Sequence, residues 1–144
     1  MAATLLDPTP HAIPSLPTQS AAARWTGRVL TGLAAAFLAV DAAFKFVPSE
    51  AAAASTATLG WQLHQMPILG TIAAVCLVLY LIPRTAPLGA ILWTGYFGGA
   101  IATHLRVDNP LATHTLFPIY VAALVWGGLY LRDARVRALL GPRR

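Results

Sequence analysis

Residues 88–108 read LGAILWTGYFGGAIATHLRVD, and this stretch decides the fold class. No charged side chain occurs from Leu88 to Leu105, and Arg106 and Asp108 follow at once. A helix of about 20 mostly apolar residues, with a range of roughly 17 to 25, crosses the hydrocarbon core of a bilayer. The stretch therefore predicts a membrane-spanning helix over 88–105 that ends at a polar surface.

Three other apolar runs predict three more spans, over 29–47, 61–82 and 116–131, the second with a bend at Pro67. The composition agrees, because 57% of the 144 residues are hydrophobic and 10% are charged, whereas soluble domains have roughly 25% charged residues. We therefore expect an all-α, integral membrane four-helix bundle within residues 23–137, surrounded by a lipid bilayer.

The two ends of the chain differ from this apolar domain. Residues 1–22 contain four prolines and no basic residue, which predicts a disordered tail, and residues 138–144 form a basic tail. Eight of the ten Lys and Arg residues flank one side of the predicted spans, and only Lys45 and Arg106 flank the other. Because basic residues accumulate on the cytoplasmic side, we expect both termini in the cytoplasm.

Ionisable residues also gather at the opposite, outer side of the predicted spans. They are Asp41, Lys45, Glu50, His64, His104, Arg106, Asp108 and His114. A charge near the centre of a span costs about 2.5 to 3.5 kcal/mol, so such groups pair, reach water or serve a function. The candidate ligand-binding residues are Asp41, Lys45, His64, His104 and Arg106.

The pattern leaves several interpretations of these residues open. Asp41 and Lys45 have the i, i+4 spacing of a helical ion pair that neutralises itself. The alternatives are pairing with His104 or Arg106 on another helix, or a proton or anion site. His104 and Arg106 project about 160° apart on a regular helix, so they cannot face one pocket together.

Several kinds of site are absent from the pattern. The single cysteine, Cys76, excludes a dithiol mechanism. His64, His104 and His114 have no neighbours at metal-ligand spacing, so no metal site is predicted. Nucleophilic triads and phosphate-binding loops are missing, and topology accounts for the basic residues, so no nucleic acid partner is expected.

Small residues form faces on two of the predicted helices. Gly95, Gly98 and Gly99 lie on the third span, and Gly127 and Gly128 lie on the fourth. Such faces allow close helix contact, either within the chain or in a homo-oligomer. A groove for a flat ligand beside Gly95 and Gly99 is the alternative.

Two motifs extend the interpretation, TGYFGGAIATHLRV at 94–107 and FPIY at 117–120 followed by WGGLYLRD at 126–133. Over about residues 25–137 the chain resembles the DoxX-like family of small four-span bacterial membrane proteins. The resemblance implies a multi-pass protein of the bacterial inner membrane. Relatives are linked to a thiosulfate:quinone oxidoreductase subunit and to a membrane complex associated with oxidative-stress enzymes. Lys45, His104 and Arg106 match the family motif, while catalytic residues stay unknown.

Three functional hypotheses follow. The first is a redox-associated accessory subunit that binds a quinone-like ligand near the outer face. There His104 would donate to a carbonyl oxygen, Asp41 and Lys45 would relay a proton, and Tyr96 would help to form flat apolar walls. The second is a non-enzymatic scaffold that binds a membrane or redox protein, and the third is a small oligomeric transporter or channel. We do not expect the chain to act as an enzyme alone.

Overall fold

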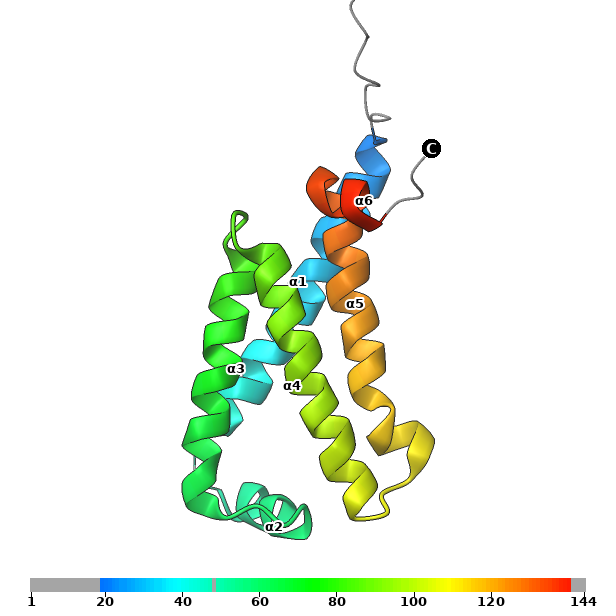
Figure 1. Ribbon diagram of the computed structural model, residues 1–144. Coiled ribbons are helices and arrows are strands. Elements are labelled where there is room, and N and C mark those ends of the chain that lie inside the picture. Colours follow the sequence, from blue (N-terminus) through cyan, green and yellow to red (C-terminus); the bar gives the residue numbers. More distant parts are fainter. Residues whose placement is uncertain (1–18, 48, 141–144) are drawn as a thin grey trace, which may run out of the picture.

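The computed structural model describes residues 19–47 and 49–140, and these residues form helices and connecting turns without a strand (Figure 1). The long helices are α1 (Ala21–Phe44), α3 (Met66–Leu81), α4 (Ala86–Arg106) and α5 (Phe117–Arg132). The shorter elements are α2 (Glu50–Thr58), the 3₁₀ helix η1 (Leu63–Gln65), the π-helix η2 (Leu111–Thr115) and α6 (Ala134–Leu140).

Three helical segments are long and apolar enough to cross a membrane: Ala21–Phe44, Leu63–Leu81 and Leu111–Arg132. They overlap the predicted spans 29–47, 61–82 and 116–131. The second differs from the prediction, because Pro67 does not bend a longer helix. It lies in the first turn of α3, where its missing N–H leaves no helical hydrogen bond unmade. α4 covers the predicted span 88–105 but is richer in glycine and threonine, and its crossing stays a prediction.

The four long helices pack side by side, and each of them contacts two of the others. α1 contacts α3 and α5, and α4 contacts the same two helices from the other side. The start of α1, the α3–α4 connection and α6 lie at one end, which we call the α6 end (Figure 1). α2 and the α4–α5 connection lie at the opposite end, the α2 end. The first and last described helices therefore begin and finish at the same end.

Large side chains fill the space between the helices. Leu38, Tyr80, Trp93, Val125 and Leu129 are each at most 1% exposed. Lipid tails are as apolar as these side chains, so close packing and buried hydrogen bonds hold such helices together in a bilayer. The stability of this core in a bilayer therefore depends on how closely the side chains fit together more than on their hydrophobicity.

Buried hydrogen bonds connect the helices. The Tyr80 hydroxyl of α3 donates to the Val125 carbonyl of α5 at 3.0 Å and lies 3.4 Å from Thr31 Oγ1 of α1. The Trp126 indole N–H of α5 donates to Thr94 Oγ1 of α4 at 2.9 Å. Each helix pair joined in this way has a polar contact that lipid cannot replace.

Glycine brings α1 and α5 closest together. A Cβ at Gly128 would lie 2.7 Å from Thr31 Oγ1, and one at Gly27 would lie 2.8 Å from Leu131 Cβ. Real Cβ atoms essentially never come this close to another heavy atom. Gly128 was among the glycines expected to pack, whereas Gly27 was not.

The other expected glycine contacts are not made among residues 19–47 and 49–140. Nothing lies within 4 Å of a Cβ built at Gly95, Gly98, Gly99 or Gly127. The reason for α4 is that it turns its large residues inward, with Trp93 fully buried, which directs Gly95 and Gly98 outward. Gly99 borders a cavity near the α2 end. These four glycines therefore make no close helix contact among the described residues. A homo-oligomer contact there stays a prediction.

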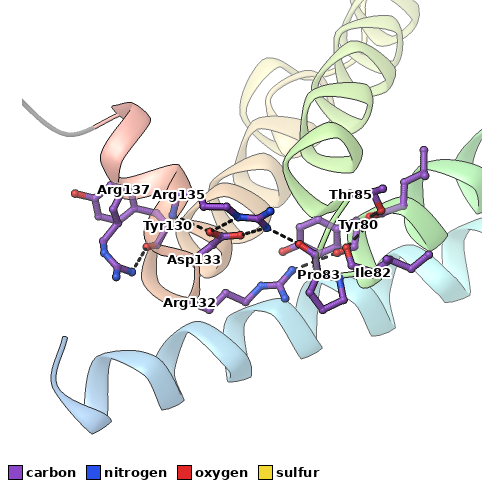
Figure 2. Close-up of polar contacts among 10 residues, drawn as sticks. Tyr80, Ile82, Pro83, Thr85, Tyr130, Arg132, Asp133, Arg135 and Arg137 are labelled. Atoms are coloured by element: carbon purple, nitrogen blue, oxygen red, sulfur yellow. Dashed lines mark hydrogen bonds and ion pairs between the residues drawn. The ribbon is translucent and has the colours of Figure 1, made fainter. Parts of the chain in front are cut away.

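Arginines secure the α6 end (Figure 2). Arg132 donates to the Tyr80 carbonyl at 3.2 Å, and Arg135 donates to the Pro83 carbonyl at 2.6 Å. Arg135 also pairs with Asp133 at 2.8 Å. Its hydrogen bond holds the pKa of the Asp133 carboxyl below the ordinary value. Arginines of α5 and α6 therefore join this end of the chain to the end of α3 and to the α3–α4 connection.

Parts of both predicted tails are helical in the described residues. Ser20 caps α1 by accepting a hydrogen bond from the Ala23 N–H at 3.2 Å, so residues 21–22 belong to the helix. Residues 138–140 belong to α6. The expected disorder of residues 1–18 and the basic residues 141–144 lie outside the described residues.

Candidate ligand-binding cleft

A cleft of about 590 Å³ lies among the helices near the α2 end. α1, α2, α3, α4 and α5 all contribute to its lining. Most of the lining is apolar, including Phe37, Leu38, Phe44, Leu69, Ile72, Phe97 and Val121. The titratable side chains in the lining are Asp41, Lys45, Tyr96 and His104. Three of the five predicted site residues therefore line one cavity.

Asp41 and Lys45 form an ion pair in this lining. The Lys45 Nζ lies 2.5 Å from Asp41 Oδ2 and 3.2 Å from the Asp41 carbonyl oxygen. The i, i+4 spacing on α1 produces this contact, and Lys45 caps the C-terminal end of the helix, where a cation is favoured. The pair therefore presents polar atoms to the cleft without adding net charge to it.

Tyr96 of α4 faces the same pair. The Lys45 Nζ lies 5.9 Å from the centre of the Tyr96 ring, and the edge of that ring meets Trp93 at 5.2 Å between centroids. Its hydroxyl makes no hydrogen bond to another described residue. The sequence interpretation treated Tyr96 as an apolar wall. The structure adds a hydroxyl beside a cation, which only the packing of α1 and α4 against α3 brings about.

His104 lies farther along α4, toward the α4–α5 connection. Its Nδ1 is 2.9 Å from the Asn109 amide nitrogen, and its ring centre is 6.0 Å from that of His114. An amide nitrogen donates, so with this side-chain assignment Nδ1 accepts and Nε2 carries the hydrogen. His104 therefore has one nitrogen committed to Asn109 and one N–H available as a donor.

The cleft contains two separate polar positions. Tyr96 and His104 are eight residues apart on α4, which corresponds to about 12 Å along a helix. Asp41 and Lys45 accompany Tyr96 at the inner position. A small polar group can thus contact one position or the other, and only a longer molecule can contact both.

Two predicted site residues lie outside this cleft. Arg106 donates from Nη2 to the Leu59 carbonyl at 2.8 Å and lines a neighbouring hollow instead. This separation from His104 agrees with their expected projection from different sides of the helix. His64 is exposed on η1 and lines neither cavity. His64 therefore lies apart from Asp41 and Lys45, because the turn at η1 directs it outward, and a role for it in ligand binding stays a prediction.

Other lining residues were not predicted. Ala52, Ser55 and Thr56 of α2 cover part of the cleft. The sequence does contain a signal for the start of α2. Ser49 caps this helix by accepting a hydrogen bond from the Ala52 N–H, and Glu50 lies in its first turn before a run of alanines. Among the described residues, no group of three or more His, Cys, Asp and Glu side chains could hold a metal ion.

Comparison with known proteins identifies a family. No curated protein and no solved structure matches this chain. The model of the DoxX-like family matches residues 29–128, a stretch that includes Lys45, His104 and Arg106. This match covers more than half of the chain and confirms the resemblance that the sequence indicated. The protein, with its apolar helices, is a multi-pass membrane protein that belongs to the DoxX-like family.

Proposed function

We propose that this chain is a four-span protein of the bacterial inner membrane, with both termini in the cytoplasm, that binds a lipid-soluble ligand in the cleft. The arrangement of basic residues supports this topology. Arg84, Arg132, Arg135 and Arg137 belong to segments of the α6 end, where α1 also begins (Figure 1). Four crossings return the chain to the side on which it started, so α4 is the remaining span.

The observation that carries the ligand proposal is the cleft itself. Its volume of about 590 Å³ falls within the roughly 300 to 1,000 Å³ of small-molecule sites, which are mostly apolar with a few polar groups. Asp41 and Lys45 supply those groups with balanced charge. Such a site favours a molecule with a large apolar part and one or two oxygen atoms that accept hydrogen bonds.

A quinone is one molecule of this class. Its ring would lie against Phe97, and one oxygen would accept from the Lys45 ammonium or the Tyr96 hydroxyl. The two oxygens of a quinone lie across a single six-membered ring, whereas Tyr96 and His104 are about 12 Å apart along the axis of α4, so we assign the carbonyl contact to one position. The inner position therefore replaces His104 as the proposed contact for a quinone carbonyl.

The test is to purify the protein in mild detergent and analyse the lipids that remain bound. Ala100 lines the cleft and Ile91 is 56% exposed on the same helix. We expect wild type and Ile91→Trp to retain a lipid-soluble ligand and Ala100→Trp to lose it. Purified wild type that carries no such ligand and shows no saturable binding of added quinone or lipid would refute the proposal.

The topology needs its own experiment. Ser55 and Ala138 lie in exposed positions in α2 and α6. In a Cys76→Ala background, we expect Ser55→Cys to react with an impermeant thiol reagent from outside the cell and Ala138→Cys to react only after lysis. Labelling of position 138 in intact cells would overturn the orientation.

A second candidate function rests on the outward glycine face of α4. Gly95, Gly98 and Gly99 have open space around them, and such faces mediate close contacts between membrane helices. A second copy or another membrane protein that packs there would make the chain a scaffold subunit. If the partner is a second copy, a Gly98→Cys variant without Cys76, treated in the membrane with an added oxidant, should then form a disulfide-linked dimer, whereas Ile119→Cys, exposed on α5, should not.

A further inference from the structure

A second hollow of about 340 Å³ lies beside the cleft at the α2 end. It is lined by Gly60, Trp61, Gln65, Ala102, Thr103 and Arg106. Trp61 and Thr103 also line the cleft, so the two cavities adjoin through these residues. The cleft is mostly apolar, whereas the hollow contains a cation and no acidic residue.

The Arg106 side chain lines the hollow and is exposed, and one hydrogen bond to the backbone positions its guanidinium. Its Nη2 donates to the Leu59 carbonyl at 2.8 Å, at the C-terminal end of α2. Gly60 has a φ of 74°, and a Cβ there would lie 2.8 Å from Nη2. Glycine therefore serves twice at this position, because it adopts the left-handed backbone and leaves room for the guanidinium.

Most of the hydrogen-bonding capacity of this group is unused. A guanidinium has five N–H donors, and Arg106 forms no ion pair with any residue in the described ranges 19–47 and 49–140. Gln65 accepts a hydrogen bond from the Gln62 N–H through Oε1, which leaves its amide nitrogen as a donor. The hollow thus offers several donors and one positive charge, the pattern that recognises carboxylate and phosphate oxygens.

We propose that the ligand of this protein is an anionic amphiphile, with its carboxylate or phosphate bound to Arg106 in the hollow and its apolar chain in the cleft. This proposal rests on ligand binding in the cleft and narrows it to a class. The anionic group belongs in the hollow because the Asp41–Lys45 pair deeper in the cleft neutralises itself and leaves no net positive charge for an anion, whereas Arg106 has no acidic partner among the described residues. A neutral quinone, by contrast, makes no use of Arg106.

The experiment compares four probes that separate head group from chain. Dodecyl phosphate, dodecanoate, dodecanol and inorganic phosphate are titrated into the full-length protein in a neutral detergent, with binding followed by thermophoresis. A charge-assisted contact favours either anionic amphiphile over dodecanol by at least about 10-fold in Kd. Inorganic phosphate alone should bind at least about 10-fold more weakly than dodecyl phosphate, since it lacks the chain.

Variants assign the discrimination to Arg106. We expect Arg106→Gln to bind dodecanol as wild type does but to lose the preference for anionic probes, while Arg106→Lys keeps part of it. Arg84→Gln is the matched control, because Arg84 is an exposed arginine in the α3–α4 connection at the other end of the molecule. Arg84→Gln should prefer the anionic probes over dodecanol to the same degree as wild type. Retained dodecanol binding shows that a variant is folded.

The outcomes separate this inference from ligand binding in general. Equal affinity of wild type for dodecanol and the anionic probes overturns the inference and leaves the cleft as a site for neutral ligands. Binding of none of the chain-bearing probes overturns both proposals. Inorganic phosphate binding as tightly as dodecyl phosphate would mean that the hollow takes a free oxyanion, which also overturns the amphiphile. A preference that persists in Arg106→Gln would remove Arg106 from the site.

Discussion

Removing the negative charge of Asp41 tests the cleft by its effect on stability. In Asp41→Asn the side chain keeps its size and an oxygen acceptor, but the Lys45 ammonium loses its counter-charge. Lys45 is 13% exposed and Asp41 is 39% exposed in their side chains. The ammonium would then retain the new side-chain amide oxygen, the backbone carbonyl of residue 41 and the face of Tyr96 as partners, and none of these carries a negative charge.

The two extremes for ion pairs bracket the magnitude. Breaking a buried pair by removing one partner costs about 3 to 5 kcal/mol, and an exposed pair contributes about 0 to 1 kcal/mol. Because Asp41 is more than a third exposed, solvent in the cleft screens part of the interaction. We therefore expect Asp41→Asn to lower the free energy of unfolding by about 1 to 3 kcal/mol.

A double substitution distinguishes loss of the pair from loss of packing. Asp41→Asn with Lys45→Met leaves no unpaired charge in the cleft, so it should be less destabilising than Asp41→Asn alone. The assay is unfolding in mild detergent with added SDS, followed by circular dichroism. Glu50→Gln is the control, because Glu50 is exposed on α2, and it should stay within about 0.5 kcal/mol of wild type.

Two results would refute this reasoning. Asp41→Asn with wild-type stability would mean that the cleft is wet enough to solvate the Lys45 ammonium by itself. A double variant less stable than Asp41→Asn would mean that the Lys45 side chain stabilises the protein through packing or its ring contact rather than through the pair. The first result would remove the low-polarity cleft on which the ligand proposal depends, and the second would remove the ion pair as the source of the stability.

Three further predictions concern the helix contacts and the α6 end. Gly128→Leu should destabilise the protein by about 1 to 3 kcal/mol or more in the same unfolding assay, because the new side chain would meet the backbone of α1. Gly95→Leu is the control, because no described atom lies within 4 Å of a Cβ at that position, and its stability should stay within about 0.5 kcal/mol of wild type. Tyr80→Phe removes the hydrogen bond to the Val125 carbonyl and should cost about 0.6 to 1.5 kcal/mol; an unchanged unfolding curve would contradict this. The lowered pKa of Asp133 contributes stability that is present above about pH 4 and is lost as the pH falls through the folded-state value. The melting temperature of wild type in detergent should therefore decrease more between pH 5 and pH 2.5 than that of Asp133→Asn, and identical pH profiles would show that the contact with Arg135 does not affect stability.

Local patterns predicted the helices well because hydrocarbon leaves the backbone few alternatives. A lipid-exposed segment must satisfy its N–H and C=O groups internally, so a long apolar run becomes a helix. The Asp41–Lys45 contact was also predictable, since both residues lie on one helix and depend only on its geometry. The same applies to the separation of His104 from Arg106 on α4.

Contacts between helices could not be predicted in this way. The glycines of α4 have the spacing of a packing motif, yet Gly128 and Gly27 are the ones that mediate the closest approach of α1 and α5. Spacing identifies a face that permits contact, but which face a partner occupies depends on how Trp93 and Tyr80 fill the centre. His64 was misplaced for a related reason, because the turns around η1 set its direction.

The sequence by itself determined the all-helical class, the spans near residues 29–47, 61–82 and 116–131, the family and the self-neutralising pair of α1, because each depends on interactions within one segment. Only the tertiary structure decided that Asp41, Lys45, Tyr96 and His104 line one cleft while Arg106 occupies a hollow beside it. These groups come from different helices, and their proximity follows from the order and depth of helix packing. That packing is a sum of many shape-dependent contacts, which no single stretch of the chain encodes.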